Sequence, residues 1–211
     1  WSIALDAPTI SKIASKPRDL TKYSASNLKL WLRCGDKAEP ESTTSIARAD
    51  YSAEFDGSAE TIKGGNLNDE LRNISNLTAS AWIYPTHTGT GSTYYSIVNQ
   101  WDYSSVQNWG LWLKTDGATD SALHWNGGGS TLNAVEDGTK RIPTNEWTHI
   151  CATKNGSAIK LYVNGSEVAS GSDSSSAIPD VGGILRIGSQ GSSGSNGTFF
   201  KGKISNVITY K

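Results

Sequence analysis

A cluster of aromatic and amide side chains between residues 94 and 126 is the part of this sequence best suited to holding a ligand. The residues that we predict to contact the ligand are Tyr94, Tyr95, Trp101, Asp102, Tyr103, Trp125 and Asn126. Sugars present apolar C–H faces and hydroxyl edges, which suit aromatic rings paired with amides or carboxylates. The run Trp101-Asp102-Tyr103, followed by two serines, is typical of an exposed loop. The alternative is that the whole cluster only packs inside the fold.

The acidic and histidine residues do not show the spacing of a hydrolase. Cleavage of a glycosidic bond needs two carboxyl groups about 5 to 10 Å apart, and no strand-like segment carries alternating acidic residues. Asp69 and Glu70 fall in the one helix-like segment, 66–73, where adjacent residues do not share a face. The histidines are not accompanied by the Gly-x-Ser-x-Gly motif of serine hydrolases. We therefore predict that the chain is not an enzyme.

Charge and cysteine content exclude several classes of protein. The 19 basic and 20 acidic side chains leave a net charge of −1, which argues against nucleic-acid binding. No apolar run approaches the roughly 20 residues needed to cross a bilayer. Cys34 and Cys151 each lack a second ligand at the spacing of a zinc site. They are either two buried thiols or one disulfide.

Short strand-like segments separated by turn residues recur from residue 28 onward, without a strand–helix–strand rhythm. Asn164-Gly165 accepts the positive φ angles of a type I′ hairpin. The expected strands are 28–34, 51–57, 77–84, 94–99, 109–114, 122–125, 147–153, 159–163, 167–168, 184–188 and 203–210. This pattern predicts an all-β fold in which two antiparallel sheets pack as a β-sandwich of the jelly-roll type.

Two further expectations concern packing. Trp109 and Trp112 are three positions apart, so on a strand they face opposite sides and at most one lies in the interior. The Ser- and Gly-rich runs 170–176 and 188–197 are too polar to pack, which predicts mobile loops.

Residues 1–27 differ from the rest of the chain. Their apolar residues are scattered among prolines, serines and lysines, at a spacing that fits neither a helix nor a strand. These apolar residues are Ile3, Leu5, Ile10, Ile13 and Leu20. We predict an extended arm or linker over 1–27, with its apolar side chains along the domain surface or against another chain. A single domain is expected over 28–211.

Four segments resemble, in the same order, motifs of the laminin-G-like jelly-roll domains of the concanavalin A-like lectin and glucanase superfamily. They are AEFDG at 53–57, LTASAWIYP at 77–85, WTHICA with KLYVNG within 147–165, and FKGKISNVITY at 200–210. The resemblance covers residues 28–211 and implies the two-sheet fold, with Trp82 and Trp147 packed on core strands. It does not specify a ligand.

The resemblance also implies a calcium site, because these domains often hold the ion with a carboxylate of the last strand. Ser205 and Asn206 stand at that position here, and the missing charge weakens a site for a cation that prefers carboxylates. Asp56 is the remaining candidate ligand, so we include Ca²⁺ as a candidate cofactor. The alternative role of Asp56 is to form the turn at the end of its strand.

Together these features predict a non-catalytic recognition or adhesion module that binds a glycan or a cell-surface ligand. The resemblance extends to domains on bacteriophage virions and bacterial surfaces, and implies an extracellular, cell-surface or virion location. The alternative is a structural protein of a virion or extracellular assembly, in which residues 1–27 contact neighbouring virion subunits or copies of the chain.

Overall fold

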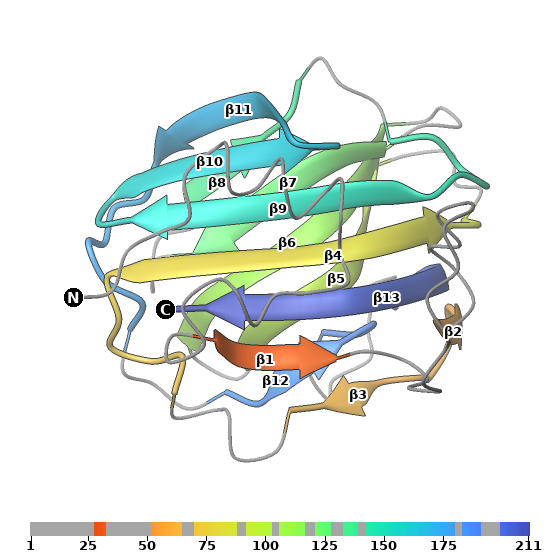
Figure 1. Cartoon of the computed structure of the whole chain (residues 1–211), viewed down its shortest axis with the longest axis horizontal. Coiled ribbons are helices and arrows are strands. Elements are labelled where there is room, and N and C mark those ends of the chain that lie inside the picture. Colours follow the sequence, from red (N-terminus) through yellow and green to blue (C-terminus); the bar gives the residue numbers. More distant parts are fainter. Residues whose placement is uncertain are drawn as a thin grey trace, which may run out of the picture.

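The protein is a sandwich of two antiparallel sheets (Figure 1). The computed structural model describes residues 28–32, 52–64, 70–87, 92–102, 106–116, 121–127, 133–138, 142–179, 183–190 and 199–211. Thirteen strands run through these ranges. Within the same ranges, no helix has the length and apolar character needed to cross a membrane. The predicted all-β, two-sheet fold is confirmed.

Sheet A forms the front layer in Figure 1 and has seven strands. In spatial order its main path is β1 (Leu28–Leu32), β13 (Lys201–Tyr210), β4 (Asn76–Pro85), β9 (Thr148–Asn155), β10 (Ala158–Val163) and β11 (Ser166–Ser172). The short β2 (Ala53–Asp56) pairs with the first part of β13. Strands from both ends of the chain therefore lie side by side in this sheet.

Sheet B forms the rear layer and has six strands. Their spatial order is β3 (Ile62–Lys63), β12 (Leu185–Ile187), β5 (Ser92–Asp102), β6 (Val106–Asp116), β7 (Ser121–Gly127) and β8 (Asn133–Glu136). The sequence did not predict the short β3 and β8. Both lie at an edge of the sheet, where fewer apolar side chains are needed and the strand signal is weak.

The core lies between the two sheets and follows from strand alternation. On β4, Leu77, Ala79, Ala81 and Ile83 are buried in the main apolar cluster. Trp109 of β6 and Trp125 of β7 stack there, with ring centroids 5.7 Å apart and planes at 14°. The stacked pair of large rings fills the space between the sheets.

The hairpin between β10 and β11 forms as predicted. Asn164 and Gly165 have φ angles of 49° and 80°, the left-handed region that both central positions of a type I′ turn require. The Oδ1 atom of Asn164 also accepts a hydrogen bond from the backbone N–H of His149 at 3.0 Å. This contact ties the hairpin to β9.

The prediction of a mobile loop over 170–176 was wrong for its first half. Residues 170–172 are part of β11 and pair with β10. Asp173 then turns into the interior, where its Oδ2 lies 3.0 Å from Nζ of Lys154. Both side chains are almost fully buried, and Nζ also donates to the carbonyl of Ser175 at 2.7 Å. A buried ion pair needs such additional hydrogen bonds to offset desolvation.

Two other expectations concern the N-terminal segment and the two cysteines. Residues 1–27 lie outside the described residues, so the arm remains a prediction. Cys151 is a buried free thiol, which agrees with the first of the two cysteine alternatives, while Cys34 also lies outside the described residues.

Candidate functional site

The outer face of sheet B, turned away from the core, carries the candidate site. On β6, Trp109, Leu111 and Leu113 belong to the core. Side chains alternate along a strand, so Trp112 and Lys114 face outward. The strand register then places Tyr94 of β5 opposite Lys114, and His124 of β7 opposite Trp112. Residues from neighbouring strands thus meet on one face.

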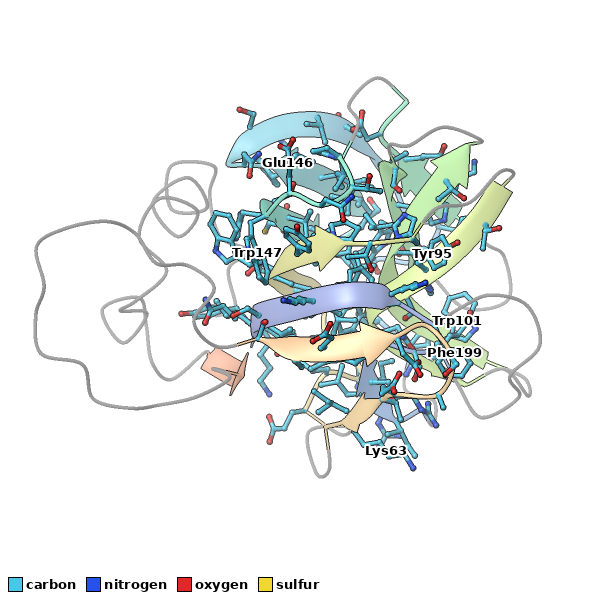
Figure 2. The ribbon with its side chains drawn as sticks, turned by 90° about the vertical axis from the view of Figure 1, so that its right-hand side faces the viewer. Lys63, Tyr95, Trp101, Glu146, Trp147 and Phe199 are labelled. Atoms are coloured by element: carbon cyan, nitrogen blue, oxygen red, sulfur yellow. The ribbon has the colours of Figure 1, made fainter. Side chains whose placement is uncertain are left out.

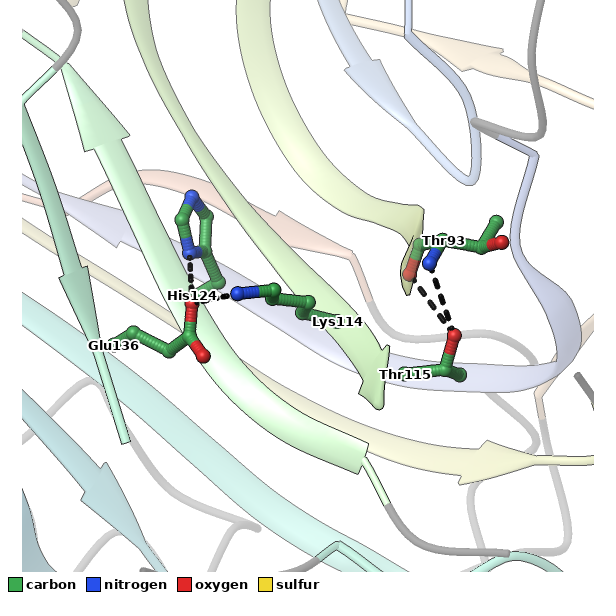
Figure 3. Close-up of polar contacts among 5 residues, drawn as sticks. All are labelled: Thr93, Lys114, Thr115, His124 and Glu136. Atoms are coloured by element: carbon green, nitrogen blue, oxygen red, sulfur yellow. Dashed lines mark hydrogen bonds and ion pairs between the residues drawn. The ribbon is translucent and has the colours of Figure 1, made fainter. Parts of the chain in front are cut away.

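Four of these side chains form what we call the Tyr94 cluster: Tyr94, Lys114, His124 and Glu136. Nζ of Lys114 lies 2.7 Å from Oε2 of Glu136 and 5.8 Å from the centroid of the Tyr94 ring. Nδ1 of His124 lies 3.3 Å from the same Glu136 oxygen, as Figure 3 shows. The His124 ring meets the Tyr94 ring edge-on at 4.9 Å. Every member therefore contacts at least one other.

The electrostatics of the cluster follow from this geometry. Burial lowers the pKa of His124, against the opposing effect of Glu136, so the ring is neutral at pH 7. The hydrogen bond with Glu136 raises the pKa of Lys114. Burial acts to raise the pKa of Glu136, but Lys114 and His124 outweigh it and lower that pKa. The cluster holds one positive and one negative charge side by side.

Tyr94 is the member most open to water. It is 37% exposed and is the one large apolar side chain exposed among the residues that the structure describes. The strand pairing beneath it is reinforced by Thr115, whose Oγ1 accepts a hydrogen bond from the N–H of Thr93 at 3.1 Å and donates to its carbonyl at 3.2 Å (Figure 3). The exposed ring consequently sits on a part of the sheet where the two strands are held by extra hydrogen bonds.

Trp101 does not lie in an exposed loop, contrary to the prediction. β5 continues through Trp101 and Asp102, and Trp101 is 4% exposed. It packs edge-to-face on Trp112, with ring centroids 5.2 Å apart, on the sheet B side of the molecule (Figure 2). The Trp112 ring in turn covers Gly110, where a Cβ atom would lie 2.1 Å from it. Trp101 therefore acts in packing, and Tyr103 lies outside the described residues.

Trp125 and Tyr95 also face away from the Tyr94 cluster, so both are corrections to the predicted site. Trp125 is fully buried beneath the sheet in its stack with Trp109. Tyr95 packs against the core and stacks on His87, with centroids 4.1 Å apart. Neither ring can meet a ligand on the outer face without unpacking the core.

Asn126, another predicted residue, lies on the same outer face as Tyr94. It lies opposite Gly110 of β6, is half-buried, and its Oδ1 atom is buried without a hydrogen-bond partner. Asn126 lies one outward position beyond His124 on β7, roughly 7 Å farther along the strand. It can serve as a second polar contact for a ligand longer than one sugar.

Sequence reasoning missed Lys114, His124 and Glu136. The signal for Lys114 was available, because alternation on 109–114 places it on the same side as Trp112. Glu136 could not be found, because it lies on the edge strand β8 and reaches the cluster only through the register His124↔Glu136.

A serine and a histidine also meet at the end of the sandwich. Nε2 of His87 lies 2.8 Å from Oγ of Ser121, and both residues are buried. Burial lowers the pKa of His87 to about 4. A nucleophile enclosed in this way has no access to substrate, so the pair contributes to packing.

Asp56 takes the turn role that was the alternative to metal binding. Its Oδ1 accepts hydrogen bonds from the backbone N–H and the hydroxyl of Ser58, each at 2.7 Å. Hydrogen bonds with Glu60 and then Ser58 lower the pKa of Asp56 to about 2. No group of three or more metal-ligating side chains occurs within the described ranges. These residues do not make a calcium site by themselves, and calcium remains a prediction.

The fold and the sequence now decide the family. The sequence pattern of the concanavalin A-like lectin/glucanases superfamily matches residues 56–211. The chain belongs to this superfamily. No curated protein matches the chain.

Three solved structures illustrate the similarity of fold. Domain 4 of AbnA, an extracellular arabinanase from Geobacillus stearothermophilus solved with arabinotriose, has a TM-score of 0.55 and 22% identity over 84% of this chain and 80% of its own. The CBM40 domain of a Ruminococcus gnavus sialidase, bound to sialyllactose, has a TM-score of 0.53 and 13% identity over 75% of this chain and 90% of its own. The enzymatically active domain of tailspike protein 2 from bacteriophage CBA120 has a TM-score of 0.52 and 14% identity over 72% of this chain and 24% of its own. At these identities the likeness concerns the fold.

Proposed function

We propose that this chain is a non-catalytic glycan-recognition module that binds its ligand over the Tyr94 cluster. The observation that carries the proposal is the exposed Tyr94 ring beside the Lys114–Glu136 ion pair. The apolar face of a sugar can stack on the ring, while its hydroxyls accept from the ammonium group and donate to the carboxylate.

The ligand chemistry follows from the charges of the cluster. The charge of Lys114 is offset by Glu136 at 2.7 Å, and His124 is neutral at pH 7 because burial lowers its pKa. A site without net charge suits neutral sugars better than sulfated or carboxylated ones. Membership of a superfamily of lectins and glucanases, and the two fold relatives solved with oligosaccharides, support glycan binding in general. The preference for a neutral sugar rests on the charges of the cluster, because sialyllactose, the ligand of one relative, carries a carboxylate.

A glycan array with the full chain tests the proposal, followed by titration calorimetry with a bound glycan. Tyr94→Ala should weaken binding at least about tenfold, since loss of an anchoring aromatic contact costs more than about 1.4 kcal/mol. Tyr94→Phe is the matched control, because it keeps the ring, and should retain most of the affinity. If no glycan binds, the function is wrong; if Tyr94→Ala binds normally, the site is wrong.

Display outside the cell, on a virion or on a cell surface, is part of the same proposal. A structural role in a virion or extracellular assembly is the second candidate. The similarity in fold to the bacteriophage tailspike domain supports a place in a virion, although the match covers only 24% of that chain. Mass spectrometry of the native complex would identify the proteins that accompany the chain, and recovery as an isolated cytosolic protein would contradict both settings.

A further inference from the structure

The outer face of sheet A carries a row of side chains that point away from the core yet are shielded from water. The register aligns Ile208 of β13, Ser80 of β4, Cys151 of β9 and Tyr162 of β10 in one row. Cys151 and Tyr162 form an apolar cluster separate from the main core. Each of the four is at most 3% exposed.

Neighbouring rows on this face have the same character. Trp82 packs on His149, with ring centroids 5.3 Å apart, and both are at most 4% exposed. Tyr210 lies opposite Thr78, and both are buried. Apolar side chains as large as Ile208, Tyr162 and Trp82 are rarely left open to water when they gather on one face.

The described strands do not cover this face, because all thirteen belong to the two sheets. Trp147, in the loop before β9, packs on Tyr84 at one end of it, with centroids 5.6 Å apart (Figure 2). The row from Ile208 to Tyr162 therefore needs a cover from another segment of the chain or from a partner.

We propose that residues 1–27 pack across the outer face of sheet A of their own chain. The segment leads directly into β1 at Leu28, which pairs with Tyr210 at the margin of this face. Extended at about 3.3 Å per residue, 27 residues reach roughly 90 Å. The five strands from β1 to β10 span only about 20 Å, so the segment is long enough to cross them.

Composition favours this segment over residues 33–51, which also adjoin sheet A in sequence. Residues 1–27 supply the apolar side chains Trp1, Ile3, Leu5, Ile10, Ile13 and Leu20. Residues 33–51 are rich in charged, Ser and Thr residues and offer only Ile46 and Tyr51 as large apolar side chains. Burying the first set on the face removes more apolar surface from water.

His149 offers a polar contact for the same segment. Its Nδ1 atom is buried and has no hydrogen-bond partner among the described residues. A buried polar atom is normally satisfied, and the backbone of residues 1–27 would supply the partner: an N–H group if Nδ1 is unprotonated, a carbonyl if Nδ1 carries the proton.

Photo-crosslinking of the full chain tests where the segment lies. A benzophenone amino acid replaces Ile10, and mass spectrometry identifies the peptides to which it is joined. We expect adducts on β4, β9 or β10 within a monomer. Adducts on sheet B or on residues 33–51 would overturn the proposal, and adducts between two chains would assign the face to a second copy instead.

Thiol labelling of Cys151 gives an independent measurement. The full-length chain carries Cys34→Ser, so that Cys151 is the one thiol that can be labelled. In the unsubstituted chain, burial raises the pKa of the Cys151 thiol and blocks access to it. Ile10→Ser with Ile13→Ser should uncover the thiol and raise its labelling rate at least about tenfold. Lys12→Ser with Lys16→Ser is the matched polar control and should leave the rate unchanged. Equal rates in both variants, with near-ultraviolet circular dichroism showing a folded core, would refute the proposal.

Discussion

The two outer faces of the sandwich hold similar residue types but differ in what reaches water. The face of sheet B combines Tyr94 and His124 with an ion pair, and its tyrosine is open. The face of sheet A combines Tyr162 and His149 with a thiol, and all three are shielded. An aromatic residue that points outward therefore does not by itself mark a binding site. Our proposed site therefore rests on the combination of an exposed ring and neighbouring charged groups, which one ligand can reach together.

The largest contrast is expected between the core of sheet B and its outer face. Trp125→Ala should lower the free energy of unfolding by about 3–5 kcal/mol, because it removes a ring stacked in the closed core. Tyr94→Ala should cost less than about 1 kcal/mol, as for most surface substitutions. Urea unfolding at pH 7 measures both. Similar losses in the two variants would show that Tyr94 is a packing residue.

The second largest effect expected is a loss of folding stability at low pH, caused by His149 on the shielded face of sheet A. Burial lowers the pKa of His149 from 6.5 to about 4, so the folded ring stays neutral while the unfolded ring takes up a proton below pH 6.5. Stability is therefore lost as the pH falls from 6.5 to about 4, by up to about 3 kcal/mol for this residue.

Urea midpoints measured from pH 7 to pH 4 follow this loss. His149→Gln should reduce the dependence without removing it, because burial also lowers the pKa of His87 to about 4. His124→Gln on the open face should change it less, because Glu136 opposes the lowering of the His124 pKa. An unchanged slope in His149→Gln would show that other groups cause the acid sensitivity.

The smallest effect is expected from the ion pair of the Tyr94 cluster. Lys114 and Glu136 have side chains 24% and 33% exposed, so their coupling free energy for folding should be below about 1 kcal/mol. A double-mutant cycle with Lys114→Met and Glu136→Gln measures it, at low and at 1 M salt. A coupling that is larger, or unaffected by salt, would mean that the pair is structural.

The sequence predicted the fold well because strand alternation, Asn-Gly turns and family motifs all act locally. Eleven of the thirteen observed strands overlap the predicted segments, and 164–165 forms the expected hairpin. Asn206 shows the limit of this reasoning. The sequence identified it as a departure from the family pattern, but only the structure reveals its φ of 49° in the irregular part of β13.

The candidate site was predicted less well, because exposure depends on contacts between distant segments. Of the residues predicted to contact a ligand, Tyr94 and Asn126 lie on the outer face of sheet B, whereas Trp101 and Trp125 are buried by packing. Tryptophans in a Gly-, Ser- and Asn-rich segment look alike in sequence whether they lie under a sheet or over it. Their burial is decided by strand register, which the sequence does not display.

The buried pair between Lys154 and Asp173 bears on how the molecule opens. The backbone N–H of Asp173 bonds to the carbonyl of Ser157, and that of Ile178 to the carbonyl of Ile74. If residues 173–178 detached alone, the Lys154 ammonium would remain in the interior without its counter-charge, at a cost of several kcal/mol. We therefore expect this end of the sandwich not to fray ahead of the rest, so that its amide hydrogens exchange with solvent about as slowly as those of the central strands.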